Sequence, residues 1–169
     1  MKIILFRPQI PQNTGNIVRT CAVFNAGLVL VRPLGFSTSS RMLKRAGLDY
    51  WNDVSIEEID NLETYLEKQN VPFYFFSSKA EKNFSEVSFS EDSLLIFGNE
   101  QEGLAPIFRK RWPSQFVKIP MKESSRCLNL SNSVAIASYE LIRQNPQNLS
   151  TARNKLNATL TNAAEATGK

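Results

Sequence analysis

The chain lacks histidine altogether and has only two cysteines, Cys21 and Cys127. Without an imidazole, the Ser-His and Cys-His pairs that activate many nucleophiles are excluded, and so is the usual proton carrier near neutral pH. The two cysteines lie far apart in the sequence and show neither the spacing of a metal cluster nor a disulfide framework. A reducing compartment fits, and any chemistry must proceed without imidazole.

Long apolar runs are also missing. Stretches such as Leu94 to Phe97 are only a few residues long, far short of the roughly 20 residues that span a bilayer. The amino terminus has neither the long apolar region nor the small-residue cleavage site of a signal peptide, and we interpret it as a first strand. We therefore expect a soluble, cytoplasmic protein with no membrane partner.

The composition permits one compact core. With 169 residues, 42% of them hydrophobic, the chain has the usual length of a single domain. Its formal net charge is only +4, but basic residues are grouped in two stretches: Arg41, Lys44 and Arg45, and Arg109, Lys110 and Arg111. Such groups suit an anionic partner, although one group taken alone is more often a solvated helix face.

Short apolar runs alternate with helical patterns along the chain. Runs 2–6, 28–31, 73–76, 94–97 and 116–119 are predicted to be buried strands. Helices are predicted over 15–25 with Gly27 as the stop, from Ser55, where Ser55 and Glu58 have capping-box spacing, and over 132–143. This alternation predicts an α/β fold whose mainly parallel sheet is covered by helices on both faces.

The last stretch differs from the rest in composition. We expect one domain over residues 1–145, followed by a tail over 146–169 that is rich in Asn, Thr and Ala and poor in large apolar residues. A disordered segment or a peripheral helix is expected there.

The first of three polar clusters covers residues 11–19, where the first strand gives way to a helix. Ligands of open α/β sheets are usually bound at such strand ends. Asn13 and Thr14 can cap the helix, and capping alone accounts for them. It does not account for Arg19, which lies one turn further into the helix.

The other two clusters follow later strands. Residues 98–104, Gly-Asn-Glu-Gln-Glu-Gly-Leu, come directly after the run 94–97. The carboxylates there would repel phosphate, so this is not a phosphate loop, and an ordinary polar turn is the alternative. In the third cluster, 124–134, capping explains one polar residue but not Asn129, Ser131 and Asn132 together.

In this order and at these separations, the clusters resemble the motifs of SpoU-type methyltransferases of the SPOUT superfamily, in particular the small tRNA 2′-O-methyltransferases of the TrmL/YibK type. The resemblance runs from Met1 to about Arg143 and includes Pro-Leu-Gly-Phe at 33–36 and Arg-Ala-Gly-Leu-Asp-Tyr at 45–50. It implies an α/β-knot fold with a deep trefoil knot in the carboxy-terminal half, and a homodimer with its active site near the subunit interface. It also implies S-adenosyl-L-methionine as methyl donor, S-adenosyl-L-homocysteine as product, and no metal.

The implied activity is tRNA (cytidine(34)/5-carboxymethylaminomethyluridine(34)-2′-O)-methyltransferase, which methylates the ribose of the wobble nucleotide. Arg19 would engage the 2′-hydroxyl as a general base, or it would grip the adjacent phosphate and stabilise the developing alkoxide. The other catalytic candidates are Asn13, Glu100, Asn129, Ser131 and Asn132.

The resemblance also implies two sets of binding residues. The methyl donor would contact Phe76, Gly98, Gly103, Leu104, Ile119, Met121, Cys127 and Leu128. The anticodon stem-loop of tRNA would contact Arg41, Lys44, Arg45, Arg126 and Tyr139. Two positions depart from the family pattern: Cys127 stands where relatives often have serine, and Asn99 where close relatives often have proline.

Three alternatives stay open at this stage. The enzyme could act on ribosomal RNA or on another position of tRNA. The chain could be a catalytically silent RNA-binding module, against which the presence of Arg19, Glu100 and Asn129 argues. A nucleotide-binding dehydrogenase is a third reading, but its Gly-x-Gly-x-x-Gly fingerprint is missing after the first strand.

Overall fold

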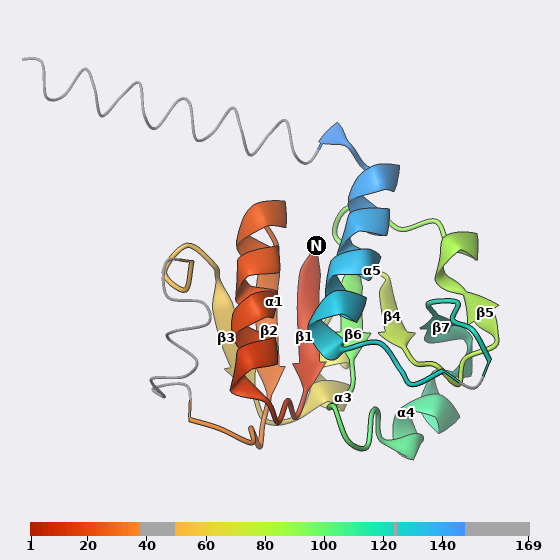
Figure 1. The fold of residues 1–169 in the computed structure, drawn as a ribbon, viewed down its shortest axis with the longest axis horizontal. Coiled ribbons are helices and arrows are strands. Elements are labelled where there is room, and N and C mark those ends of the chain that lie inside the picture. Colours follow the sequence, from red (N-terminus) through yellow and green to blue (C-terminus); the bar gives the residue numbers. More distant parts are fainter. Residues whose placement is uncertain (38–49, 124, 148–169) are drawn as a thin grey trace, which may run out of the picture.

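The computed structural model describes residues 1–37, 50–123 and 125–147. They form one parallel sheet in the order β3-β2-β1-β6-β4-β7-β5 (Figure 1). The strands are β1 (Lys2–Phe6), β2 (Gly27–Val31), β3 (Ile56–Ile59), β4 (Phe73–Phe76), β5 (Lys82–Asn83), β6 (Leu94–Phe97) and β7 (Phe116–Lys118). This confirms the predicted parallel α/β fold. Among the described residues, no helix has the length and apolar character to cross a membrane.

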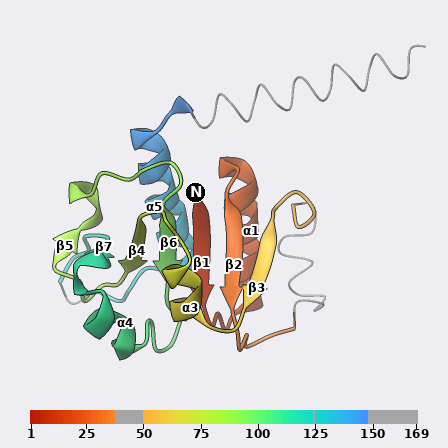
Figure 2. The same ribbon diagram turned by 180° about the vertical axis from the view of Figure 1, so that it is seen from behind.

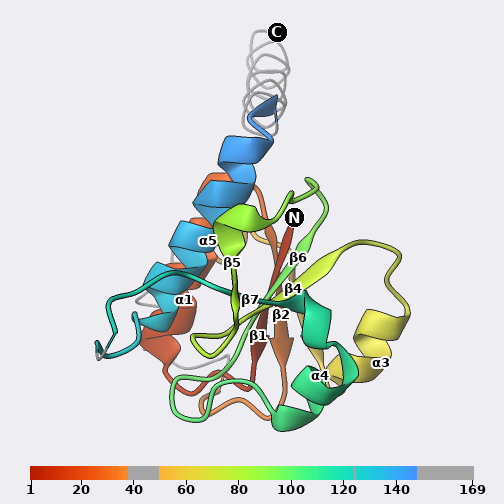
Figure 3. The same cartoon turned by 90° about the vertical axis from the view of Figure 1, so that its right-hand side faces the viewer.

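Helices cover both faces of the sheet, as Figure 2 and the side view of Figure 3 show. One face carries α1 (Pro11–Phe24) and α5 (Leu130–Gln144), and the other carries α3 (Leu62–Glu67) and α4 (Pro106–Arg111). Two short 3₁₀ helices, η1 (Phe84–Glu86) and η2 (Pro113–Gln115), complete the elements.

The alternation of side chains along β1 shows why two cores form. Ile3 and Leu5 pack in the cluster beneath α1 and α5, whereas Ile4 and Phe6 pack in the cluster beneath α3 and α4. All four are buried because a strand covered on both faces has no solvated side. The continuous apolar runs that predicted the strands are therefore the consequence of double coverage.

One predicted helix is absent, and two others have different bounds from those predicted. No helix begins near Ser55, because residues Ile56–Ile59 form the edge strand β3, and α3 begins only at Leu62. Asn61 is its N-cap, accepting a hydrogen bond from Thr64 N at 2.9 Å. The spacing of Ser55 and Glu58 suggested a capping box, but parallel pairing of this short run with β2 decides the structure.

The first helix begins and ends at different residues from those predicted. It begins at Pro11, so Asn13 and Thr14 lie inside the first turn rather than capping it, and Ile10 is the N-cap. Asn25 adopts the left-handed conformation (φ 51°) and ends the helix, which leaves Gly27 as the first residue of β2. The carboxy-terminal helix starts two residues before the predicted 132, because Asn129 is its cap.

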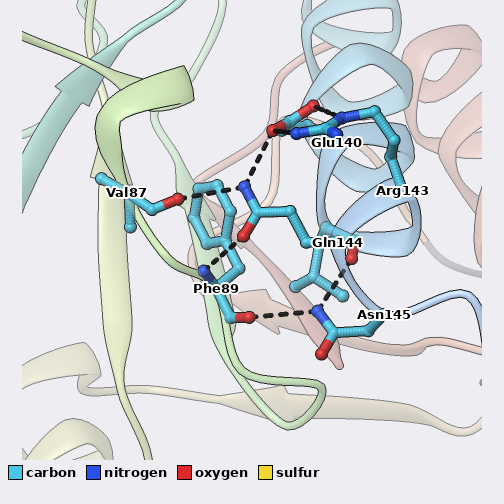
Figure 4. A network of polar contacts seen from close by, with 7 residues as sticks. Val87, Phe89, Glu140, Arg143, Gln144 and Asn145 are labelled. Atoms are coloured by element: carbon cyan, nitrogen blue, oxygen red, sulfur yellow. Dashed lines mark hydrogen bonds and ion pairs between the residues drawn. The ribbon is translucent and has the colours of Figure 1, made fainter.

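The last turn of α5 is joined to the segment between η1 and β6 (Figure 4). Gln144 accepts a hydrogen bond from Phe89 N at 2.8 Å and donates one to Val87 O at 3.0 Å. Asn145 Nδ2 donates to Phe89 O at 3.0 Å. These amides satisfy backbone groups of a buried segment that has no strand partner there. The predicted tail falls largely on residues 148–169, which lie outside the described residues.

Candidate active site

The three polar clusters meet at the carboxyl ends of the strands, where α1 and α5 both begin (Figure 1). Asn13, only 6% exposed, lies between the other two clusters. Its Nδ2 donates to Glu100 Oε1 at 2.9 Å, and its Oδ1 accepts from Asn129 Nδ2 at 3.0 Å. One side-chain amide thus links segments that are 87 and 116 residues away in the sequence. We call Glu100, Asn13, Asn129 and Ser131 the polar chain.

Glu100 fixes the entry into α1. Its carboxylate accepts hydrogen bonds from Gln9 N at 2.9 Å and Ile10 N at 3.2 Å, besides the one from Asn13. Because Ile10 has no side-chain cap to offer, the carboxylate supplies the acceptor that the start of the helix needs, and its charge suits the positive end of the helix dipole. No sequence pattern predicted that these two backbone N–H groups would bind Glu100.

Asn129 holds the other end of the polar chain. Its Oδ1 accepts from Ser131 N at 2.8 Å and from Ser131 Oγ at 2.7 Å, which caps α5. Ser131 is nearly buried, whereas Asn132, in the same helical turn, faces solvent. The side chain of Asn129 therefore caps α5 and also binds Asn13 at the start of α1.

The loop that carries Glu100 is a tight turn. Asn99 and Gly103 exchange both backbone hydrogen bonds at 3.1 Å, and Asn99 Oδ1 accepts from Gln101 N and Glu102 N. Gly103 has φ +73°, and a Cβ on Gly98 would lie 2.1 Å from the carbonyl carbon of Gly103. Both positions therefore require glycine. The Asn99 side chain closes this loop, so the departure from proline there has a structural role.

The predicted methyl-donor residues lie at or beyond the carboxyl ends of three neighbouring strands, β6, β4 and β7. Phe76 ends β4, Gly98 follows β6, and Ile119 follows β7. The segment between β7 and α5 approaches the one after β4, where Cys127 Sγ lies 3.5 Å from Ser78 Oγ. Leu104, Ile119 and Met121 are half-buried, and Leu128 is 38% exposed.

These residues would suit a ligand with a flat aromatic base such as adenine. Partly exposed apolar side chains on adjoining loops offer walls for the base, and the loop backbone offers donors and acceptors. A separate hollow of about 720 Å³ lies at the other end of the same sheet edge, beyond β1, β2 and β3. Its lining is Arg7, Arg32, Pro33, Leu34, Phe36, Ser37, Glu58 and Asp60, none of which belongs to the predicted cofactor set.

Arg19 lies on α1 outside the polar chain. It is exposed and follows Asn13 by six residues, about 9 Å along the helix axis. Its guanidinium carbon lies 5.3 Å from the centroid of the Tyr50 ring. The stretch 45–50 had marked Tyr50 only as part of the family resemblance, so this contact was not predicted.

Of the predicted RNA-binding residues, the structure describes Arg126 and Tyr139. Tyr139 is 61% exposed and lies near Phe24, with ring centroids 6.5 Å apart, at the far end of α5 from Arg126. Arg41, Lys44 and Arg45 lie outside the described residues. In the other basic stretch, Arg111 pairs with Glu63 and Glu67 of α3, and Arg109 lies over Phe116.

The described part of the chain contains no cluster of three or more His, Cys, Asp or Glu residues able to hold a metal ion. Burial raises the pKa of the Cys21 thiol to about 12, so this thiol stays protonated beneath α1.

An acidic loop bounded by glycines lies at the carboxyl edge of the parallel sheet and is hydrogen-bonded to the start of α1, which Asn129 joins to α5. This arrangement is typical of α/β proteins that bind a ligand at this edge. The chain belongs to the SpoU rRNA Methylase family, whose model matches residues 1–139.

Relatives and solved structures agree with this membership. A Geobacillus stearothermophilus protein with the provisional name tRNA (cytidine(34)-2′-O)-methyltransferase is 45% identical over 148 residues, covering 85% of this chain and 94% of that protein. A solved structure described as giving insights into the 2-OH methylation of C/U34 on tRNA is 40% identical with a TM-score of 0.81, covering 86% and 96%. An AdoMet-bound rRNA methyltransferase from Sinorhizobium meliloti is 26% identical with a TM-score of 0.74, covering 84% and 55%.

Proposed function

We propose that this protein transfers a methyl group from S-adenosyl-L-methionine to the ribose 2′-hydroxyl of nucleotide 34 in tRNA. The observation that carries the proposal is the polar chain, which joins the three motif clusters through Asn13. The names of relatives with 40% identity or more, which match most of this chain, favour tRNA. Ribosomal RNA is the weaker alternative, because the rRNA enzyme shares only 26% identity.

The donor would supply an activated methyl on a sulfonium and leave as S-adenosyl-L-homocysteine. The protein's task is to hold the ribose oxygen in line and to let its hydroxyl proton pass to solvent water as the oxygen–methyl bond forms. No imidazole is available for this task. Arg19 is the candidate group, because its N–H donors can bind the ribose oxygen or the adjacent phosphate and stabilise negative charge as it develops. The role proposed for Glu100, Asn13 and Asn129 is to position α1 and α5, since their hydrogen bonds hold the starts of these helices in place.

The residues proposed to hold the donor are Phe76, Gly98, Gly103, Leu104, Ile119, Met121, Cys127 and Leu128. Their place after β4, β6 and β7 supports this assignment. The geometry of the loop already requires glycine at positions 98 and 103. We therefore expect substitutions there to disturb the whole loop. No metal takes part in the proposed transfer.

A homodimer belongs to the proposal. The exposed sides of α1 and α5 carry large apolar side chains, with Val23 and Tyr139 each 61% exposed and Ile136 39% exposed. These two helices pack beside each other, so the three side chains belong to one face of the molecule (Figure 1). Because Arg19 is also exposed on α1, a second copy on this face would bring a subunit interface close to the catalytic candidate.

We also infer a trefoil knot and a cytoplasmic location. The strand β7 pairs between β4 and β5, and the chain then passes beside Ser78 before α5 packs against α1. The close approach of the segment before α5 to the segment after β4 supports the knot that the family resemblance implies. A tRNA substrate would place the protein in the cytoplasm.

The test uses purified full chain, labelled methyl donor and bulk tRNA, followed by nuclease digestion and mass spectrometry of the methylated nucleoside and its position. We expect a 2′-O-methylated nucleotide at position 34. Arg19→Ala should keep the fold, the dimer and donor binding but lose transfer, because only the proposed catalytic guanidinium is removed. Arg109→Ala, an exposed arginine on α4, is the matched control and should retain transfer.

Methylation elsewhere in the tRNA would refute the assigned position, and methylation of ribosomal RNA alone would refute the tRNA substrate. Unchanged turnover of Arg19→Ala would remove Arg19 from the mechanism. If calorimetry detects no binding of S-adenosylmethionine to the wild-type chain, the protein is instead a silent RNA-binding module.

A further inference from the structure

The surroundings of Arg19 differ from those of several other arginines in the described part of the chain. Arg32 pairs with Asp60 at 2.9 Å and Arg143 with Glu140 at 2.7 Å, so the N–H donors of these guanidinium groups are engaged by carboxylates. The contact recorded for Arg19 among the described residues is with the face of the Tyr50 ring. A ring face attracts the cation without using its N–H donors.

The Tyr50 ring is itself held in place. It is half-buried and packs against the core cluster beneath α1 and α5, and its carbonyl accepts a hydrogen bond from Asp53 N at 3.1 Å. The distance of 5.3 Å from the guanidinium carbon to the ring centroid lies within the roughly 6 Å over which cation–π attraction acts. An anchored ring therefore restricts an otherwise flexible, exposed side chain.

We propose that Tyr50 is the positioning residue for Arg19: its ring face holds the guanidinium in one orientation while the N–H edge stays available to the RNA. The inference rests on the proposed function, in which Arg19 acts on the ribose or its phosphate. Its physical basis is that a long arginine side chain loses rotamer freedom when it engages the reacting ribose oxygen in the transition state, and a prepositioned chain has less freedom to lose. Geometry of this kind affects the chemical step more than substrate affinity.

The decisive comparison is between Tyr50→Leu and Tyr50→Phe, measured by steady-state transfer at varied tRNA concentration. Tyr50→Leu removes the π face, and we expect kcat to fall about 10-fold, which corresponds to about 1.4 kcal/mol, with KM for tRNA and donor affinity within about twofold of wild type. Tyr50→Phe keeps the face and should retain most of the transfer. In an Arg19→Ala background, Tyr50→Leu should lower the residual rate no further.

Trp51→Leu is the matched control, because Trp51 is the next residue and packs against the same core cluster, whereas the guanidinium of Arg19 lies over Tyr50. An equal loss of kcat in Trp51→Leu would show that local packing, not the ring face, matters and would overturn the proposal. So would equal losses in Tyr50→Phe and Tyr50→Leu, or a wild-type kcat in Tyr50→Leu.

If Tyr50→Leu does not fold, a fluorination series decides. Phenylalanine analogues with increasing ring fluorination, incorporated at position 50, keep the shape but weaken the negative ring face. A stepwise fall of kcat along the series supports the proposal, and a constant kcat overturns it. Absence of any transfer in the wild-type chain would instead refute the proposed function, so the two failures are distinguishable.

Discussion

Asn13 is the residue on which the geometry of the site depends most. Replacing this nearly buried residue with alanine removes two hydrogen bonds, to Glu100 Oε1, which keeps its bond from Ile10 N, and from Asn129 Nδ2, which lies on an exposed residue. We expect Asn13→Ala to lower the free energy of unfolding by about 1 kcal/mol, the net contribution of such bonds when water can solvate part of the site. Urea unfolding measures this, and methyl transfer should fall as well, because the starts of α1 and α5 lose their link.

The matched control is Gln12→Ala, one residue earlier and exposed on the same helix, which should change the unfolding free energy by less than about 0.5 kcal/mol. Equal stability of Asn13→Ala and Gln12→Ala would show that the polar chain contributes nothing to the fold.

Among the secondary-structure elements, the end of α5 offers a test through pH. The Glu140 carboxylate accepts hydrogen bonds from Arg143 Nε and Nη2 and from Gln144 Nε2, and the bond from Arg143 is the main cause that lowers the pKa of Glu140 from 4.5 to about 2. A lowered folded-state pKa stabilises the fold above the unfolded pKa, and this stability is lost as the pH falls toward the folded value. Because Arg143 is fully solvated, water and salt weaken the pair and its contribution to stability is small.

Glu140→Gln should therefore be less stable than wild type at pH 7, and the difference should close as the pH falls from 4.5 toward 2. Urea unfolding of both proteins along this pH range measures the difference, with Glu81→Gln at an exposed position as control. A difference that is constant with pH would mean that the carboxylate charge is not involved.

Sequence patterns predict the buried strands more accurately than the edge strands. The strands 2–6, 73–76 and 94–97 have their predicted bounds, because apolar runs in a doubly covered sheet leave little ambiguity. The edge strand β3 was missed because Glu57 and Glu58 interrupt its apolar pattern, and its identity comes from pairing with β2. The two-residue strand β5 is too short for any sequence pattern and exists through its pairing with β7.

For the whole molecule, the exposed apolar side chains of α1 and α5 predict self-association. Val23→Glu places a charge on this face, and we expect the dimer to dissociate, because burying an unpaired carboxylate is costly. Sedimentation should change from twice the mass of one chain to a single mass, and methyl transfer should fall with the dimer fraction. Ile107→Glu, at an apolar position that is 48% exposed on α4, is the control and should stay dimeric. A monomeric wild-type chain would refute the homodimer.

The parallel α/β class and the order of the three polar clusters could be predicted without coordinates, because buried strands and loop motifs leave local patterns in the chain. Only the tertiary structure decided that Asn13 joins Glu100 to Asn129, that backbone N–H groups before α1 engage Glu100, and that Arg19 rests on Tyr50. Those contacts join residues far apart along the chain. Residue type restricts which partners each side chain can take, but the packing of α1, α5 and the sheet selects among them.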